Sequence, residues 1–182
     1  MRLQGKVAIV TGGGSGFGEA IAHTFAREGA RVVVADIAGE TAARVAADIG
    51  DAASPCTADV TRDADTGAMI AQALDRFGRL DILVNNAGTT HVNMPMTEVS
   101  EADFDRVFAV NVKSLFWAAR HVVPVFRKAG GGSIINTAST AGLRPRPGLS
   151  WYNGSKGAVV ILTKSVAVEL APDNIGVNAL CP

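Results

Sequence analysis

The amino-acid sequence predicts an α/β protein in which a doubly wound parallel sheet is covered by helices on both faces. Short Val/Ile-rich segments alternate with longer segments of helical periodicity along the 182 residues, which is typical of parallel strands joined by crossover helices. The short segments are also apolar at successive positions, as expected of strands that are buried on both faces.

The strands are expected where β-branched residues are grouped between turn signals. They are Val7–Val10, Arg31–Ala35, Pro55–Ala58, Leu80–Val84, Ser133–Thr137 and Ile175–Ala179. A helix should begin near Glu19, after the first strand. Another should include Ile70 and Phe77, which belong to an apolar set at helical spacing.

A later helix should open with a capping box, because Ser100 and Asp103 have that spacing and precede an apolar stripe. The stripe consists of Phe104, Val107, Phe108, Asn111 and Leu115. The segments 88–96 and 141–150 should be loops. Because no internal repeat or linker divides the chain, residues 1–182 are expected to form a single domain.

Composition restricts the partners. Seventeen basic residues balance seventeen acidic residues without any Lys/Arg block, so we expect no nucleic-acid partner. No segment has the apolar length of a membrane span, and the run Val7–Val10 is too short for a signal peptide, so we expect a cytoplasmic protein without a membrane partner. Cys56 and Cys181 lack C-x-x-C spacing and the histidines lack ligand spacing, so we expect reduced thiols and no metal.

A glycine-rich loop directly follows the first expected strand, and it reads Thr-Gly-Gly-Gly-Ser-Gly-Phe-Gly from Thr11 to Gly18. A strand, a glycine turn and a helix start together form an anion site, because glycines let backbone N–H groups approach a pyrophosphate and the helix dipole favours its charge. The G-x-G-x-x-G fingerprint counted from Gly12 is absent, since Phe17 stands at its last glycine. An ordinary flexible turn is the alternative interpretation.

Asp36 ends the second expected strand, about eighteen residues beyond Gly18. An acidic side chain at this place can accept hydrogen bonds from an adenosine ribose and repels a 2'-phosphate. No arginine follows at Ile37, Ala38 or Gly39, so NAD(H) is favoured over NADP(H). A helix cap or turn residue is the alternative role for Asp36.

Four residues are candidates for proton chemistry. Tyr152 is the only tyrosine and lies four residues before Lys156, so a helix would place both on one face, where the ammonium favours an ionised phenol. Ser139 follows the fifth expected strand, at the sheet edge where ligands of open α/β sheets bind. Asn111 interrupts an apolar stripe, and a buried amide needs partners. Each signal is weak alone.

Taken together, these pieces resemble the short-chain dehydrogenase/reductase family, of the classical type, from the first strand nearly to the last residue. The matching motifs are Thr11-Gly-x-x-x-Gly16-x-Gly18, Asp59-Val60, Asn85-Asn86-Ala87-Gly88, Asn111, Ser139 and Tyr152-x-x-x-Lys156. Their joint occurrence in order makes the resemblance specific. It implies a Rossmann-type sheet and hydride transfer between NAD and a secondary alcohol or ketone.

The resemblance also implies residue roles. Tyr152 would be the general acid/base, Lys156 would bind the nicotinamide ribose and favour the ionised tyrosine, Ser139 would hold the substrate oxygen, and Asn111 would anchor a proton-relay water. The residues implied for cofactor binding are Gly12, Ser15, Gly16, Phe17, Gly18, Asp36, Asp59, Val60, Asn86, Gly88, Tyr152 and Lys156.

The chain departs from the family pattern at Gly176, where an arginine is usual, and at Ala138, where a second serine is usual. Family chains also continue beyond the position of Pro182 with a substrate lid and a last strand. We therefore expect this chain to be a fragment that lacks the C-terminal strand and lid, since a sheet without its final strand exposes an edge. A naturally truncated protein is the alternative.

The resemblance and the helix surfaces suggest a substrate class and an assembly. The resemblance suggests a sugar, polyol or other small hydroxy compound, with a 3-oxoacyl-thioester reductase or a non-catalytic NAD-binding scaffold as alternatives. The broad apolar surfaces of the Tyr152 and Phe104–Phe126 helices suggest a homo-oligomer, a tetramer by resemblance. Candidate pocket residues are His91, Met94, Met96, Arg144, Arg146 and Trp151.

Overall fold

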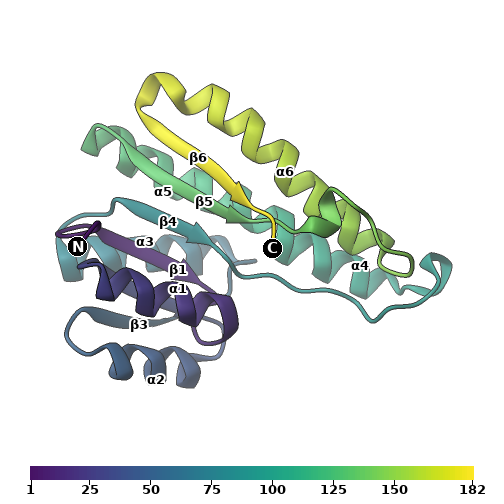
Figure 1. The fold of residues 1–182 in the computed structure, drawn as a ribbon, viewed down its shortest axis with the longest axis horizontal. Helices are drawn as coiled ribbons and strands as arrows, with labels where there is room; N and C mark the ends of the chain where they lie inside the picture. The colour runs from purple at the N-terminus through teal and green to yellow at the C-terminus, as the bar shows by residue number, and fades with distance from the viewer.

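The computed structural model describes residues 1–182. A single six-stranded parallel sheet has the order β3-β2-β1-β4-β5-β6, with helices on both faces (Figure 1). The strands are β1 (Val7–Thr11), β2 (Arg31–Asp36), β3 (Ala53–Thr57), β4 (Ile82–Asn85), β5 (Gly132–Thr137) and β6 (Ile175–Leu180). The predicted doubly wound parallel sheet is confirmed, and every strand end lies within two residues of its prediction.

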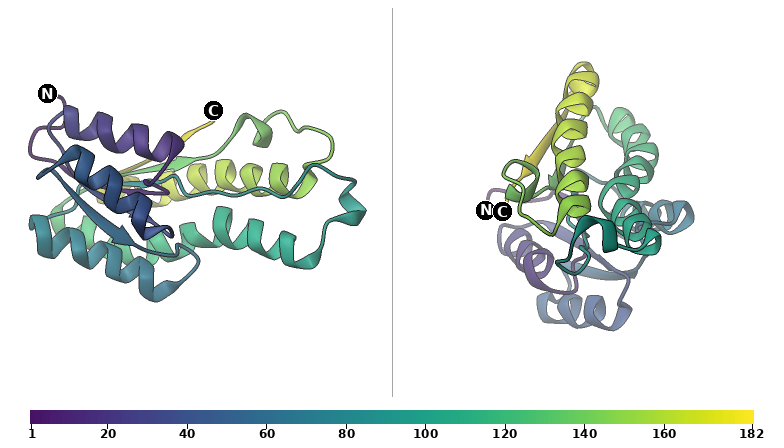
Figure 2. Two further views of the ribbon diagram at one scale, coloured as in Figure 1. Left: turned by 90° about the horizontal axis from the view of Figure 1, so that it is seen from below. Right: turned by 90° about the vertical axis from the view of Figure 1, so that its right-hand side faces the viewer.

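Six α-helices connect the strands or extend from them. They are α1 (Gly16–Arg27), α2 (Gly39–Ile49), α3 (Asp63–Phe77), α4 (Glu101–Phe108), α5 (Ser114–Ala129) and α6 (Ser150–Leu170). Helix α1 begins three residues before the predicted Glu19, so the last glycines of the loop already form its first turn. Figure 2 shows α4 and the loop that precedes α6 projecting beyond the carboxyl ends of the strands.

The capping box at the start of α4 is present. The Ser100 hydroxyl oxygen accepts from the Asp103 N–H at 3.1 Å and also donates to the Asp103 carboxylate at 2.9 Å. The single helix predicted from Phe104 to Phe126 is wrong in one respect, because a π-helical turn at Ala109–Lys113 separates α4 from α5. Such turns widen a helix locally and are frequent at functional sites.

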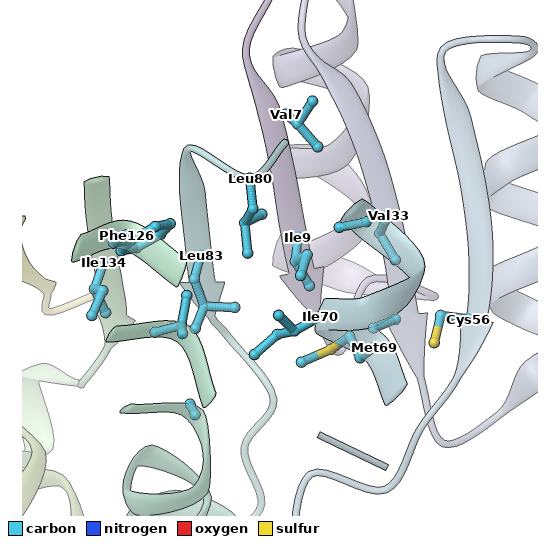
Figure 3. Close-up of a cluster of buried hydrophobic side chains, with 14 of the residues drawn as sticks. Val7, Ile9, Val33, Cys56, Met69, Ile70, Leu80, Leu83, Phe126 and Ile134 are labelled. Atoms are coloured by element: carbon cyan, nitrogen blue, oxygen red, sulfur yellow. The ribbon is translucent and has the colours of Figure 1, made fainter. Parts of the chain in front are cut away.

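Two hydrophobic clusters lie on opposite faces of the sheet, because neighbouring strand residues point to opposite sides. Val7 and Ile9 of β1 pack with α3 and α5, whereas Ala8 and Val10 of the same strand pack with α1 and α2. Figure 3 shows the first cluster, with Phe126 of α5 beside the central strands. Both faces of β1 are therefore buried, as its continuous apolar sequence predicts.

Candidate active site

The strand order reverses between β1 and β4, which are neighbours in the centre of the sheet. Ligands of open α/β sheets bind at such a switch point, outside the carboxyl ends of the strands. A cleft of about 830 Å³ lies there, and it is lined by residues that follow β1, β2, β3, β4 and β5. Each predicted site residue except Gly18 and Asn111 lines this cleft.

The glycine loop has a different requirement at each glycine. At Gly18 a Cβ would overlap the Gly12 carbonyl oxygen, and at Gly12, with φ of +61°, a Cβ would lie 3.0 Å from the Ala87 Cα. Gly16 has φ of +54°, yet a Cβ there would meet no atom within 4 Å. Gly12 and Gly18 thus allow close packing, while Gly16 provides a left-handed turn into the first turn of α1.

The start of α1 has the features of an anion site. Its N-cap, Ser15, makes no side-chain capping bond, so the N–H groups of the first helical turn have no partner from that hydroxyl. Ser15, Gly16 and Phe17 line the cleft, and Phe17 is 68% exposed. Unpaired N–H groups and the helix dipole together favour a phosphate or pyrophosphate at this place.

Asp36 lies at the end of β2 with both carboxylate oxygens engaged. Its Oδ2 accepts from the Gly14 N–H at 2.9 Å, and its Oδ1 accepts from the Ala38 N–H at 3.0 Å. Asp36 is therefore a turn residue and a cleft residue at once. Each carboxylate oxygen keeps acceptor capacity for a further donor, such as a ribose hydroxyl.

Asp59 and Val60 follow β3, the strand next to β2, and line the cleft together with Asp36. The Asp59 Oδ1 accepts from the N–H and the hydroxyl of Thr61, at 2.9 and 2.7 Å. Asn86, which follows β4, donates through Nδ2 to the carbonyl oxygens of Thr11 and Gly12, at 3.0 and 3.3 Å. The Asn86 side chain therefore ties the end of β4 to the glycine loop.

Lys156 lies in α6 with only 5% of its surface exposed. Its Nζ donates to the Thr137 carbonyl oxygen at the end of β5, at 2.8 Å. Burial lowers the pKa of the Lys156 ammonium from 10.5 to about 8, because an apolar environment disfavours the charged form. A Cβ at Gly88 would lie 3.3 Å from this Nζ and 3.4 Å from Asn111 Oδ1, so glycine allows both groups to approach.

Asn111 lies in the π-helical turn and is 3% exposed. Its Oδ1 accepts from the Thr89 N–H at 2.9 Å, while its Nδ2 donates to the Thr89 carbonyl oxygen at 2.8 Å and to Ser155 Oγ at 2.9 Å. Both amide hydrogens are therefore committed to protein acceptors. Asn111 joins the segment after β4 to α6, next to the cleft rather than on its wall.

Ser139 and Tyr152 complete the part of the cleft near Lys156. The Ser139 Oγ accepts from the Ala141 N–H at 3.1 Å, which leaves the hydroxyl hydrogen for a ligand. Tyr152 lies in the first turn of α6 and shares the cleft wall with Lys156. Asp36 ends β2 and Ser139 follows β5. These two strands are three strand spacings apart in the sheet, or about 14 Å. The cleft can therefore hold an elongated ligand.

Sequence reasoning missed several contributors. The buried Thr11 hydroxyl accepts from the N–H groups of Asn86 and Ala87, at 3.0 and 3.1 Å. The position of Thr11 at the start of the glycine motif could have identified it as a contributor to the site. The Thr137 carbonyl gave none, because a backbone acceptor has no sequence signature. Conversely, none of the six candidate pocket residues lines the cleft: His91, Met94, Met96, Arg144, Arg146 and Trp151.

None of the helices is sufficiently long and apolar to cross a membrane. The structure also contains no group of three or more His, Cys, Asp or Glu side chains arranged to hold a metal ion.

Comparison with known proteins agrees with the fold. A family model described as short chain dehydrogenase matches residues 6–182. The 4-formylbenzenesulfonate dehydrogenase of Comamonas testosteroni is 48% identical, over 100% of this chain and 73% of that protein. The sorbitol dehydrogenase of Cereibacter sphaeroides is 43% identical, over 100% of this chain and 71% of that protein.

A crystal structure of a 3-ketoacyl-(acyl-carrier-protein) reductase from Brucella melitensis, complexed with NADH, superposes with a TM-score of 0.97. Its sequence identity is 48%, and the match covers 99% of this chain and 76% of that chain. The family match spans almost the whole chain, and the superposed reductase has the same fold. This chain therefore belongs to the short-chain dehydrogenase family.

Proposed function

We propose that the protein is an NAD(H)-dependent oxidoreductase that interconverts a secondary alcohol and a ketone. The observation that carries the proposal is the convergence of Ser139, Tyr152 and Lys156 with Asp36 and the glycine loop on one cleft. The presence of proton donors and acceptors in the same cleft as a dinucleotide site indicates that both serve one reaction.

The residues of the cleft fit a nicotinamide dinucleotide. The N-terminal turn of α1 would hold the pyrophosphate, Asp36 the adenosine ribose, and Asp59 with Val60 the adenine. Asn86 and Gly88 would lie along its middle, and Lys156 would bind the nicotinamide ribose. When bound, the nicotinamide supplies hydride acceptor or donor chemistry.

Proton transfer is assigned to Tyr152. During oxidation its phenolate takes the hydroxyl proton of the substrate, while the Ser139 hydroxyl donates to the substrate oxygen; reduction is the reverse. The cationic form of Lys156 favours the phenolate. Since both amide hydrogens of Asn111 are engaged, a relay water would be held by its main-chain carbonyl or by the second lone pair of Oδ1.

NAD(H) is preferred over NADP(H) in this proposal. The Asp36 carboxylate is fixed by two backbone N–H groups at the cleft wall, so a 2'-phosphate would meet a negative charge that cannot turn away. The NADH complex of the reductase from Brucella melitensis supports the choice. A larger kcat/KM with NADPH than with NADH would contradict it.

Replacement of Tyr152 by Phe tests the reaction. The variant keeps the ring in α6 and removes only the hydroxyl, so turnover should fall by at least about a thousandfold because proton transfer contributes on that order. NADH affinity, measured by fluorescence titration, should stay within about threefold. Turnover retained in Tyr152→Phe would remove Tyr152 from the mechanism. Tight NADH binding by a wild-type protein that is inactive on every alcohol and ketone tested would instead indicate a non-catalytic scaffold.

The substrate is proposed as a class. Relatives that act on 4-formylbenzenesulfonate and on sorbitol support a sugar, a polyol or another small hydroxy compound. A 3-oxoacyl-thioester reductase is the second candidate, and it is favoured by the Brucella melitensis structure, whose reductase is complexed with NADH. Parallel assays with acetoacetyl thioesters and with a polyol and aromatic alcohol panel would separate the two.

A homo-oligomer is proposed as the assembly, with a tetramer as the form that family resemblance suggests. Helices α5 and α6 leave apolar side chains on the surface, including Phe116 at 55% and Ile161 at 63% exposure. A groove of about 300 Å³ runs between these helices, lined mostly by apolar residues. Such patches mark interfaces. Light scattering that gave a monomeric mass at micromolar concentration would contradict the proposal.

A further inference from the structure

Gly14, the third glycine of the loop, is held by side chains at both of its main-chain polar groups. Its N–H donates to Asp36 Oδ2 at 2.9 Å, and its carbonyl oxygen accepts from Arg44 Nη2 at 3.1 Å. Asp36 ends β2 and Arg44 lies in the middle of α2. The glycine loop is thus fastened to the sheet on one side and to a helix on the other.

The packing around Gly14 leaves no room for this loop to shift toward α2. Gly14 is buried, and a Cβ there would overlap Thr41 Oγ1 and lie 3.0 Å from Asp36 Oδ2. Thr41 is itself fixed, because its hydroxyl donates to the Ala38 carbonyl oxygen at 2.8 Å. The loop therefore rests directly on the first turn of α2.

Arg44 also binds the other end of the loop through α1. Its Nη1 donates to Glu19 Oε1 at 2.9 Å and to Asp48 Oδ2 at 3.4 Å. The hydrogen bond from Arg44 lowers the pKa of the Glu19 carboxyl, and the same contact raises the pKa of Arg44. One guanidinium thus connects α2 with the Gly14 carbonyl and with the first turn of α1. A planar group with several donors suits such a junction.

The contacts of Arg44 lie directly behind the cleft wall. Ser15 and Gly16 follow Gly14 and line the cleft, as does Asp36, whereas Arg44 does not. We propose that Arg44 is a positioning residue for the ADP-ribose part of the cofactor, because it fixes the Gly14 carbonyl and thereby the adjacent N–H groups and the Asp36 carboxylate. The inference rests on the proposed NAD(H) function, which it deepens.

An ordinary surface ion pair is the competing interpretation, and such pairs contribute little. The chain offers a matched control in Arg127–Asp173, which pairs at 2.8 Å with side-chain exposures of 53% and 29%. The Arg44–Glu19 pair has nearly the same values, 2.9 Å, 51% and 28%. The Arg127 pair joins α5 to the turn after α6 and touches no cleft residue, so it reports the effect of losing an ion pair alone.

The test compares Arg44→Met with Arg127→Met. We expect Arg44→Met to raise the Kd of NADH, measured by fluorescence, and of ADP-ribose, measured by calorimetry, by about tenfold each. The kcat at saturating cofactor should change less than about twofold, since the proton-transfer residues are untouched. Arg127→Met should bind both ligands like the wild type. Equal affinities of the two variants would overturn the positioning role.

Two more variants resolve which contact matters. Glu19→Gln removes the ionic partner but leaves the Gly14 contact, so NADH affinity should fall by less than about threefold; a loss equal to that of Arg44→Met would overturn the role of the Gly14 carbonyl. Arg44→Lys replaces the two guanidinium nitrogens that reach Gly14 and Glu19 by a single ammonium nitrogen, so its NADH affinity should lie between those of the wild type and Arg44→Met. Wild-type affinity in Arg44→Lys would contradict the need for two separate nitrogen donors. A wild-type protein that binds no NADH would overturn the proposed function itself, whereas wild-type binding with no loss in Arg44→Met would overturn only this inference.

Discussion

Lys156→Met tests the electrostatic consequence of burying an ammonium beside the cleft. In the folded protein burial lowers the pKa of Lys156 to about 8, against an ordinary value of 10.5. The unfolded chain therefore binds a proton that the folded chain has released between these two pH values. Because stability rises with pH wherever the unfolded state binds more protons, Lys156 destabilises the fold below about pH 8 and less as the pH rises toward 10.5.

The magnitude follows from this pKa difference. At 1.36 kcal/mol per pKa unit, the difference between the two pKa values means that Lys156 destabilises the folded protein by about 3 kcal/mol at pH 7. About 2.5 kcal/mol of this destabilisation is lost by pH 10, because the ammonium is then largely deprotonated in the folded state and partly in the unfolded state. Urea unfolding of the cofactor-free protein at pH 7, 8, 9 and 10 measures it. The free energy of unfolding of the wild type should rise relative to that of Lys156→Met by about 2.5 kcal/mol over this range.

The difference in the free energy of unfolding between the wild type and Lys156→Met cancels the contribution of the other titrating groups, because both proteins share them. Lys164→Met, on the exposed side of the same helix, is the control and should keep the wild-type pH dependence because Lys156 remains. Parallel curves for wild type and Lys156→Met would refute burial as a determinant of the Lys156 pKa. A relative fall of wild-type stability with pH would reverse the sign and refute the reasoning entirely.

Three further variants probe the rest of the cleft. Gly18→Ala introduces a Cβ that overlaps the Gly12 carbonyl oxygen, so the Kd of NADH should rise more than about tenfold; unchanged affinity would mean that the loop can yield. Asp36→Asn removes the charge that faces a 2'-phosphate, so the ratio of kcat/KM for NADPH to that for NADH should rise about tenfold or more, and a constant ratio would deny Asp36 this role. Asn153→Ala removes the bond of 2.8 Å from Nδ2 to the Arg146 carbonyl oxygen and loosens the loop that connects Ser139 to Tyr152, so the KM for the alcohol should rise severalfold while the NADH Kd stays within about twofold. A change in the NADH Kd without a change in the KM for the alcohol would contradict a role of this loop in substrate binding.

The fold was predictable because its strands are continuous apolar segments that can be recognised in the sequence. Segments such as Val7–Val10 and Arg31–Ala35 are apolar at every interior position, and only burial between two helix layers tolerates that pattern. The observed strands extend them by one residue each, to Thr11 and Asp36. The π-helical turn at Ala109–Lys113 was not predictable, because five residues are too few to alter a hydrophobic period.

Residue types and their order were enough to propose a dinucleotide cleft with a proton-transferring tyrosine. Asp36 could be assigned to the cofactor, and Tyr152 and Lys156 to one helix face, from spacing alone. The structure places all three on the wall of one cleft. Their roles stay predictions that the variants above test.

Hydrogen-bond partners far apart in the sequence were decided only by the tertiary structure. Asn111 could be recognised as a buried amide, yet its partners Thr89 and Ser155 lie 22 and 44 residues away. Likewise, nothing in the helix that contains Arg44 indicates a bond to Gly14, 30 residues earlier. Periodicity reports which face of an element is buried, whereas the partner of a polar group depends on which elements the fold brings together.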